Sequence, residues 1–193
     1  MKTTTRLFGA LAILMFFFLT SCASTKVTGE WKDPNLTAKQ FKKILVMGIA
    51  KQPKNRRFYE DEFVRQIQAK GVMAISSHTL ISQENMWDRA TIVQTLGSME
   101  FDSVIITRVV DMKSRQQYYD VNMYDYYNRS YKYRVRGSTE QQKFVFESNL
   151  YDAKTEKLVF SLSSNTYAQE NINKRLGSYI ETVLNKMVQN NLL

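Results

Sequence analysis

KKILVMGIAKQPKNRRFYEDEFVRQIQAKGVMAIS, residues 42–76, is the stretch that decides the fold. Its opening part, Lys43 to Ala50, is a compact apolar run with a charged flank, which predicts a buried strand. From Arg57 to Lys70 the apolar side chains recur every four positions, as on one face of a helix. Gly71 stands where helices commonly stop, and Val72 to Ser76 reads as a second strand. A strand, a helix and a strand in this order predict a parallel, right-handed unit.

The chain beyond residue 76 adds further elements to this unit. Ser82 to Gly97 has an irregular apolar face and predicts a helix that stops at its glycine. Phe101 to Val110 is rich in branched residues and predicts a third, central strand. Lys143 to Tyr151 and Leu158 to Tyr167 are strand patterns that predict a long antiparallel hairpin.

Two more patterns complete the expected fold. Alternation over residues 131–136 predicts another strand beside the hairpin, and Gln169 to Gln189 is the clearest amphipathic helix in the chain. We therefore expect an α/β (mixed α+β) fold in a single domain with a mixed sheet of five or six strands. Its order would be βαβαβ, then the antiparallel hairpin strands, then the C-terminal helix, with helices covering at least one face.

The stretch from residue 42 to the end of the third strand resembles the N-terminal domain of the TolB translocation protein and of related uncharacterised bacterial lipoproteins. The shared features are a strand, an acidic helix led in by Arg56 and Arg57, and a glycine before the second strand. The resemblance implies a periplasm-facing assembly or interaction module.

The beginning of the chain has the layout of a secretory signal peptide. Lys2 and Arg6 precede an apolar run from Leu7 to Leu19. That run is shorter than the roughly 20 apolar residues that a spanning helix needs, and it matches the short apolar region of a signal peptide. We therefore expect residues 1–21 to be cleaved, residues 22–40 to form a lipidated tether and residues 41–193 to form the globular domain.

Cys22 is the only cysteine of the chain and lies at the end of the apolar run. Leu19-Thr20-Ser21-Cys22 resembles a bacterial lipobox, which implies cleavage before Cys22 and attachment of fatty acyl chains such as palmitate. Two or three such chains hold a protein firmly on a bilayer. Ala23 follows the cysteine where Asp would indicate inner-membrane retention, so the resemblance implies the periplasmic face of the outer membrane. The alternative is an unmodified thiol beside an ordinary signal peptide or an uncleaved N-terminal anchor.

The charge and the cysteine count restrict the possible partners. The formal net charge is +9, and removal of Lys2 and Arg6 lowers it to +7. Such a charge attracts anionic lipid headgroups or polyanionic envelope polymers, or it simply keeps the domain soluble. Nucleic acid is not expected, because a secreted, tethered protein meets little of it. With Cys22 lipidated, the mature chain has no cysteine pair for an internal disulfide.

Catalytic signals are sparse, and we expect no enzyme activity, no cofactor and no metal. His78, in Ser76-Ser77-His78-Thr79, is the only histidine, and neighbouring Ser and His side chains rarely aim at each other. Glu60, Asp61 and Glu62 are consecutive, so they point in different directions, and we interpret them as solvated helix surface. No glycine-rich phosphate loop follows any predicted strand.

The unusual feature is QQYYDVNMYDYYNRSYKYRVR, residues 116–136, which holds seven of the eleven tyrosines. Tyrosine combines a wide apolar ring with a polar tip and suits recognition surfaces. The alternative is that some of these rings pack under a hairpin while others simply lie at the surface. The candidate interaction surface consists of Tyr118, Tyr119, Tyr124, Tyr126, Tyr127, Arg129, Tyr131 and Tyr133.

The leading hypothesis is a non-catalytic binding or assembly module, anchored to the membrane through Cys22 and binding an envelope protein or glycan. The alternatives are a periplasm-facing small-ligand binder and an envelope hydrolase. A hydrolase would need a cleft that brings His78 together with a carboxylate and a hydroxyl, and the sequence shows no such spacing.

Overall fold

The computed structural model describes residues 25–36, 40–50, 52–85, 88–110, 143–167 and 172–193. These residues form the following elements, in chain order: β1 (Thr25–Lys32), β2 (Lys43–Ile49), α2 (Pro53–Gln68), β3 (Met73–Ser76), the 3₁₀ turn η2 (Ser77–Thr79), α3 (Arg89–Ser98), β4 (Ser103–Val110), β5 (Lys143–Asp152), β6 (Leu158–Tyr167) and α5 (Ile172–Gln189).

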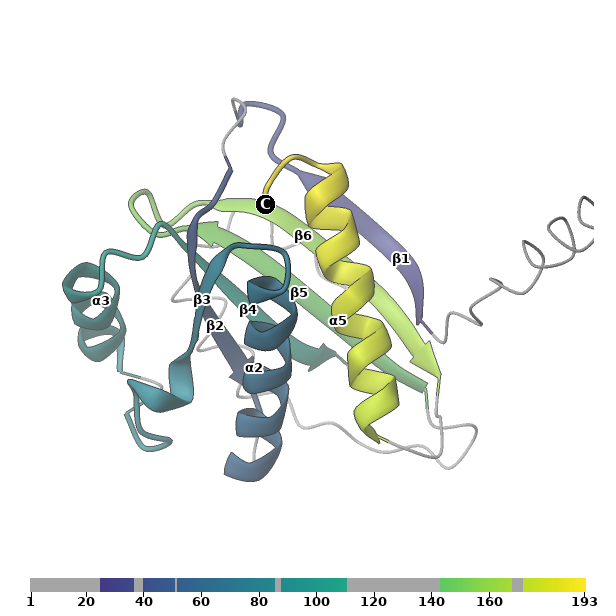
Figure 1. Cartoon of the computed structure of the whole chain (residues 1–193), viewed down its shortest axis with the longest axis horizontal. Helices are drawn as coiled ribbons and strands as arrows, with labels where there is room; N and C mark the ends of the chain where they lie inside the picture. Colours follow the sequence, from purple (N-terminus) through teal and green to yellow (C-terminus); the bar gives the residue numbers. More distant parts are fainter. Residues whose placement is uncertain (1–24, 37–39, 51, 86–87, 111–142, 168–171) are drawn as a thin grey trace, which may run out of the picture.

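The strands form one mixed six-stranded sheet in the order β1-β6-β5-β4-β2-β3 (Figure 1). β2 is parallel to both β3 and β4, while the β4–β5, β5–β6 and β6–β1 pairs are antiparallel. The α/β class, the mixed sheet, the hairpin and the C-terminal helix expected from the sequence are thus confirmed. β4 is an inner strand of the sheet, as its branched residues predicted.

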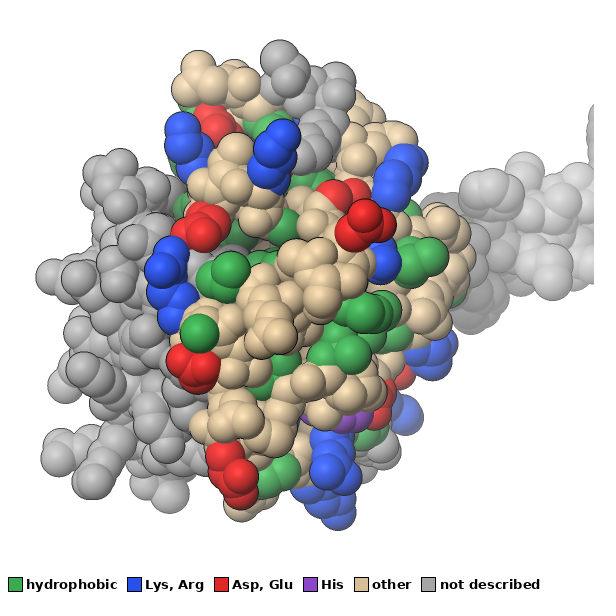
Figure 2. Space-filling model, turned by 90° about the vertical axis from the view of Figure 1, so that its left-hand side faces the viewer, with side chains coloured by type: hydrophobic (Ala, Val, Ile, Leu, Met, Phe, Trp, Pro, Cys, Tyr) green, Lys and Arg blue, Asp and Glu red, His purple; other side chains and the backbone are tan. Residues whose placement is uncertain are grey.

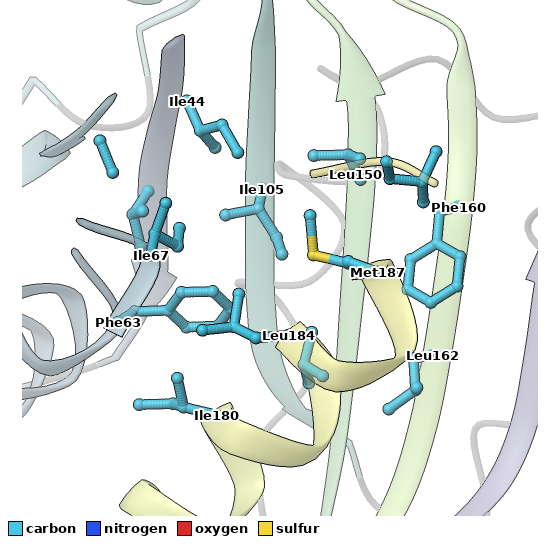
Figure 3. Packing of buried hydrophobic residues seen from close by; sticks show 14 of the residues in the cluster. Ile44, Phe63, Ile67, Ile105, Leu150, Phe160, Leu162, Ile180, Leu184 and Met187 are labelled. Carbon is cyan, nitrogen blue, oxygen red and sulfur yellow. The ribbon is translucent and has the colours of Figure 1, made fainter. Parts of the chain in front are cut away.

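The main core lies between the sheet and the helices α2 and α5, which cover the same face (Figure 1). Each strand sends alternate side chains into this layer, and the helices meet them with their apolar stripes (Figure 3). Completely buried members from five elements are Ile44, Phe63, Ile67, Leu150, Phe160, Leu162, Ile180, Leu184 and Met187. The apolar spacing that predicted each helix therefore also determines which side of it faces the sheet.

A chain of buried hydroxyl groups runs through this core. Tyr59 on α2 donates to Thr107 Oγ1 at 2.6 Å, Thr107 lies 2.5 Å from Ser148 Oγ, and Ser148 bonds the hydroxyl of Tyr179 on α5. Burial raises the pKa of both tyrosines, so they stay neutral and act as hydrogen-bonding groups. This hydroxyl chain links both helices to the middle of the sheet.

The opposite face of the sheet holds a smaller core under α3. Leu45 and Met47, which alternate with the residues of the main core along β2, pack with Ile92 and Leu96 of α3. Helices therefore cover both faces, with the first crossover, through α2, on one side and the second, through α3, on the other.

Residues next to the helix ends determine where α2 and α3 begin and where α2 stops. Pro53 occupies the first turn of α2, and after the helix Gly71 takes a φ of 79°, which favours glycine. α3 is shorter than the helix predicted over Ser82 to Gly97, because the Asp88 carboxylate accepts the backbone N–H groups of Ala90 and Thr91 and caps the helix there. Its expected stop was also wrong: α3 runs through Gly97 to Ser98.

The segment over residues 22–40, expected as a tether, contains edge strand β1, so its residues from Thr25 to Lys32 are part of the sheet. β1 pairs with β6 and is also fastened to the end of α5. Glu30 forms an ion pair with Lys186 at 3.1 Å and accepts a hydrogen bond from Asn190, and Lys32 donates to the Asn190 carbonyl. The strand predicted over residues 131–136 lies outside the described residues.

Candidate functional site

The carboxyl ends of β2, β3 and β4 lie at one edge of the sheet, here called the carboxyl edge. The crossover that leaves β2 passes through α2 on one face to β3, and the crossover that leaves the neighbouring β3 passes through α3 on the other face back to β4. Open α/β sheets bind ligands outside the carboxyl ends of strands at such a switch point. The segment 111–142 departs from β4 at this edge and returns there to β5, whose residue Val145 pairs with Val110.

Arg56 and Glu60 form an ion pair inside the fold, close to the carboxyl edge. Arg56 Nε lies 3.0 Å from Glu60 Oε1, and the two side chains are 2% and 0% exposed. Buried charges are stable in a fold only when they are paired and hydrogen-bonded. The expectation that Glu60 faces water is therefore wrong, because the apolar stripe of α2 carries Glu60 into the core.

The remaining polar atoms of this pair are also engaged. Glu60 accepts the backbone N–H groups of Gly48 and His78 at 2.8 and 2.7 Å. The Ser77 hydroxyl accepts from Arg56 Nη2 and donates to Glu60 Oε1, both at 2.8 Å. Arg56 also donates to two acceptors beyond η2: the Ile81 carbonyl and Gln83 Oε1. The pair thus joins α2, the end of β2 and the turn after β3, and its role is to hold the carboxyl edge together.

Gly48 permits this close approach of β2 to α2. A Cβ at this position would lie only 2.8 Å from Tyr59 Cδ1. The lone glycine of the KILVMGIA run is therefore a packing requirement and not part of a phosphate loop.

His78 and Asp61 meet at the rim of the same edge. His78 Nε2 lies 2.6 Å from Asp61 Oδ1, and Ser76 donates to that same oxygen at 2.8 Å. Partial burial alone would raise the pKa of Asp61, but the bonds from His78 and Ser76 outweigh it and lower the pKa. The structure thus brings the histidine to a carboxylate and a hydroxyl, which the sequence did not show. The Ser76 hydroxyl bonds the carboxylate and not the imidazole, so these three groups do not form a nucleophile activated by a base.

A second polar group lies on the α3 side of the sheet, towards the end of β4. Arg108 and Glu147 are cross-strand partners, with Arg108 Nη2 3.5 Å from each carboxylate oxygen. Asn149 donates to Glu147 at 3.1 Å, while its buried Oδ1 has no hydrogen-bond partner among the residues described. Burial raises the pKa of neighbouring Tyr151, so its phenol is neutral. This group combines a cation, a carboxylate and an amide whose oxygen can accept another bond.

Exposed apolar side chains occur on the side of the molecule that carries the β3 edge of the sheet. Met73, Leu80 and Val93 are 56%, 38% and 43% exposed. Figure 2 looks onto this side and shows hydrophobic side chains near its centre, with charged ones mostly towards the border. The outer edge of β3 is partly blocked, because the Ala74 carbonyl accepts from Gln68 and the Ser76 carbonyl from Thr79. Such capping discourages pairing with another strand.

The site residues predicted from the sequence, Cys22 and the tyrosine and arginine residues of segment 116–136, lie outside the described residues. Within the described ranges, no three His, Cys, Asp or Glu side chains gather as metal ligands would. No helix in the same ranges combines the length and apolar character needed to cross a membrane.

Sequence reasoning missed the Arg56–Glu60 pair, although a signal was present. Arg56 and Glu60 share the helix face of Tyr59, Phe63 and Ile67, at spacings of three and four residues. Two opposite charges that interrupt an otherwise apolar stripe predict a buried ion pair. The Arg108 group had no comparable signal, because its members come from two strands separated by the segment 111–142.

No protein-family model and no curated protein matches the chain. Among solved structures, the PelC dodecamer from Paraburkholderia phytofirmans is similar at 13% identity and a TM-score of 0.49, over 83% of this chain and 94% of that chain. Lipoprotein GNA1162 from Neisseria meningitidis is similar at 13% identity and a TM-score of 0.43, over 77% of this chain and 99% of that chain. Overlaps of this extent do not define a shared family.

Proposed function

We propose that the chain is a lipid-anchored lipoprotein of the bacterial envelope whose α/β domain is a non-catalytic binding or assembly module. The observation that carries the proposal is the lipobox-like Leu19-Thr20-Ser21-Cys22 at the end of a signal-like run. β1 starts only three residues after Cys22, at Thr25, so a lipid on the cysteine would hold the folded sheet at the bilayer. Ala23 supports sorting to the periplasmic face of the outer membrane, and the TolB-like pattern of residues 42–76 supports a periplasmic module.

Intact-mass analysis of protein extracted from membranes tests the anchor. The expected mass is that of residues 22–193 plus a diacylglyceryl group and, where the amine is acylated, one further chain. Cys22→Ala should abolish both the added mass and the cleavage before residue 22, whereas Ser21→Ala, which keeps a small residue, should preserve both. A mature chain that starts elsewhere, or that starts with an unmodified thiol, refutes the proposal.

The segment 116–136 is the proposed partner-binding surface. Its position in the chain supports this role, because both ends of the connection 111–142 lie at the carboxyl edge, where sheets of this kind bind ligands. Tyr124, Tyr126 and Tyr127 replaced together by Ala should lose the envelope proteins or glycans that crosslink to the wild-type chain in intact envelopes. The same three positions replaced by Phe form the matched control, which keeps the rings. Unchanged crosslinking of the Ala variant would exclude this surface.

A small polar ligand is the second candidate, favoured by the unsatisfied oxygen of Asn149 beside Arg108. Buried polar atoms without partners are rare in folded proteins and point to a missing partner. Thermal-shift screening with envelope metabolites should then find a compound that stabilises the wild type but not Asn149→Ala. The absence of any such compound would leave the binding of macromolecules as the function to pursue.

A further inference from the structure

We infer that the carboxyl edge of the sheet is a membrane-docking surface that binds anionic phospholipid headgroups through Lys26, Lys54, Arg57 and Lys174. The inference rests on the proposed lipid anchor and adds an orientation to it: this edge faces the bilayer, the opposite edge faces the periplasm, and a partner of the segment 116–136 is met close to the membrane surface.

The chain length between anchor and fold limits how far the edge can move from the membrane. Cys22 and Thr25 are three residues apart, which span at most about 10 Å when fully extended. The direction of β1 then determines which edge of the sheet the lipid anchor keeps near the membrane. β1 is antiparallel to β6, and its first residue, Thr25, pairs with Thr166 near the end of that strand. The start of β1 therefore lies at the carboxyl edge.

The beginnings of both long helices lie at the same edge. α2 starts four residues after the end of β2, and α5 starts five residues after the end of β6. Figure 1 shows the first turns of α2 and α5 at the bottom of the molecule and the start of β1 higher up, at its right-hand side. The first turns of both helices contain no acidic residue, although acidic residues are favoured there by the helix dipole.

The exposed cations at this edge are available for a ligand. Lys26 lies at the start of β1, Lys54 and Arg57 lie at the start of α2, and Lys174 lies at the start of α5. All four side chains are exposed, and the ion pairs found among the described residues involve none of them. Figure 2 shows lysine and arginine side chains gathered below the histidine at the lower border of that view.

The spacing of these cations suits a flat surface better than a small ligand. β1, which carries Lys26, and β2, which α2 with Lys54 follows, are separated by three other strands, so these two strands lie about 19 Å apart across the sheet. A lipid anchor next to β1 holds only one end of the carboxyl edge, so the domain can tilt on the membrane. Lys54 and Arg57 at the start of α2 would oppose this tilt by binding lipid headgroups. Asp61 is the largely exposed carboxylate in the first three turns of α2. It bonds His78 and Ser76, and the nearby charge of Arg57 also helps to lower its pKa.

The test uses the lipidated full chain reconstituted in vesicles of phosphatidylcholine alone or mixed with phosphatidylglycerol, each with a nitroxide headgroup quencher. Because Cys22 carries the lipid, an added cysteine is the only free thiol for a fluorophore. Asn55→Cys labels the first turn of α2 and Ala69→Cys labels its other end, about 20 Å away. We expect stronger quenching at residue 55 than at residue 69, in anionic vesicles only, and relief of that quenching at high salt.

Charge variants give the decisive comparison. Each cation near an anionic surface is expected to favour the docked state about fivefold, so Lys54→Gln with Arg57→Gln should lower the docked-to-undocked ratio about 25-fold. Lys154→Gln with Lys157→Gln removes the same charge from the exposed β5–β6 turn at the opposite edge and should change nothing.

The outcomes separate the inference from the anchor. Failure of the protein to float with vesicles refutes the lipid anchor. Flotation with equal quenching at residues 55 and 69, or with quenching that is the same in neutral vesicles, refutes the docking surface alone. A third outcome is that soluble polyphosphate binds only when Lys54 and Arg57 are present, while a fluorophore at residue 55 stays unquenched on anionic vesicles. The cations would then recognise anionic polymers and not a membrane, which also overturns the inference.

Discussion

Glu60→Gln should be one of the most destabilising conservative substitutions in the domain. The change leaves the positive charge of Arg56 inside the fold without its counter-ion, 3.0 Å from the substituted group. Removing one partner of a buried ion pair typically costs about 3–5 kcal/mol, because the other charge stays desolvated. The amide has a single acceptor oxygen, so it can accept from Gly48 or from His78 but not from both, and the loss combines the uncompensated charge with one lost hydrogen bond.

Urea unfolding followed by circular dichroism measures this loss. With a typical slope of about 1–3 kcal/mol per molar urea, the expected loss corresponds to a midpoint lower by about 2 M. Glu62→Gln is the matched control on the same helix: Glu62 pairs with Arg65 at 2.5 Å, but Arg65 is 67% exposed, so we expect little change. Arg56→Gln combined with Glu60→Gln should recover much of the stability, since no lone charge is left inside.

Two results would contradict a desolvated Arg56–Glu60 ion pair. If Glu60→Gln and Glu62→Gln shift the midpoint equally, the Arg56–Glu60 pair is not in a desolvated environment. If the double variant is less stable than Glu60→Gln alone, the penalty does not come from an uncompensated Arg56 charge.

Gly48→Ala should destabilise the fold by about 1–3 kcal/mol, because the new Cβ would collide with Tyr59. Gly97→Ala in α3, where a Cβ would meet no atom within 4 Å, should stabilise the fold by about 0.5–1 kcal/mol. Urea midpoints that shift equally, or in the opposite directions, would contradict this packing difference. Asp61 has a folded pKa below its unfolded value of 3.8, so its stabilisation is complete above that value and lost as the pH falls through the folded pKa. The stability difference between wild type and Asp61→Asn should therefore shrink below about pH 4, and a difference that persists in acid would refute the linkage. Tyr179→Phe should cost about 1 kcal/mol by removing one hydroxyl of the buried hydroxyl chain, measured by thermal unfolding, and a neutral result would mean that the bond to Ser148 adds no net stability.

The sequence predicted the elements whose side chains alternate or recur without interruption. β2, β4, the β5–β6 hairpin and α5 all have regular apolar patterns, and the structure places each of them within three residues of the expected ends. Such patterns predict well because burial on one face imposes the period directly on the residues.

β1 was missed because its pattern is irregular. The pairing with β6 shifts between Val27 and Gly29, so an extra residue breaks the alternation in the middle of the strand. Polar residues also dominate this edge strand, in which Val27 and Trp31 are the only large apolar residues. Its place in the sheet depends on β6, which follows more than 120 residues later, and local periodicity carries no information on such pairing.

The candidate sites were harder to predict than the fold for a related reason. His78 and Asp61 lie on η2 and α2, and a parallel crossover brings the end of one strand beside the helix that precedes it. Arg108 and Glu147 become neighbours only through the register of two antiparallel strands. Residue spacing along the chain predicts contacts within a helix, whereas contacts between elements require the topology.

The adjacent residues Arg56 and Arg57 show how one short motif can serve two purposes. Successive residues on a helix point about 100° apart, so one arginine enters the core while the other stays in solvent. Arg56 is 1% exposed and bonds Glu60, Ser77 and the turn beyond β3, whereas Arg57 is exposed near Lys54. Arg56 holds the start of α2 in place at the carboxyl edge. Because the helix start cannot move, the exposed cations Lys54 and Arg57 keep a constant position at that edge. Rigidity inside the edge is thus a physical precondition for a defined orientation on a charged surface.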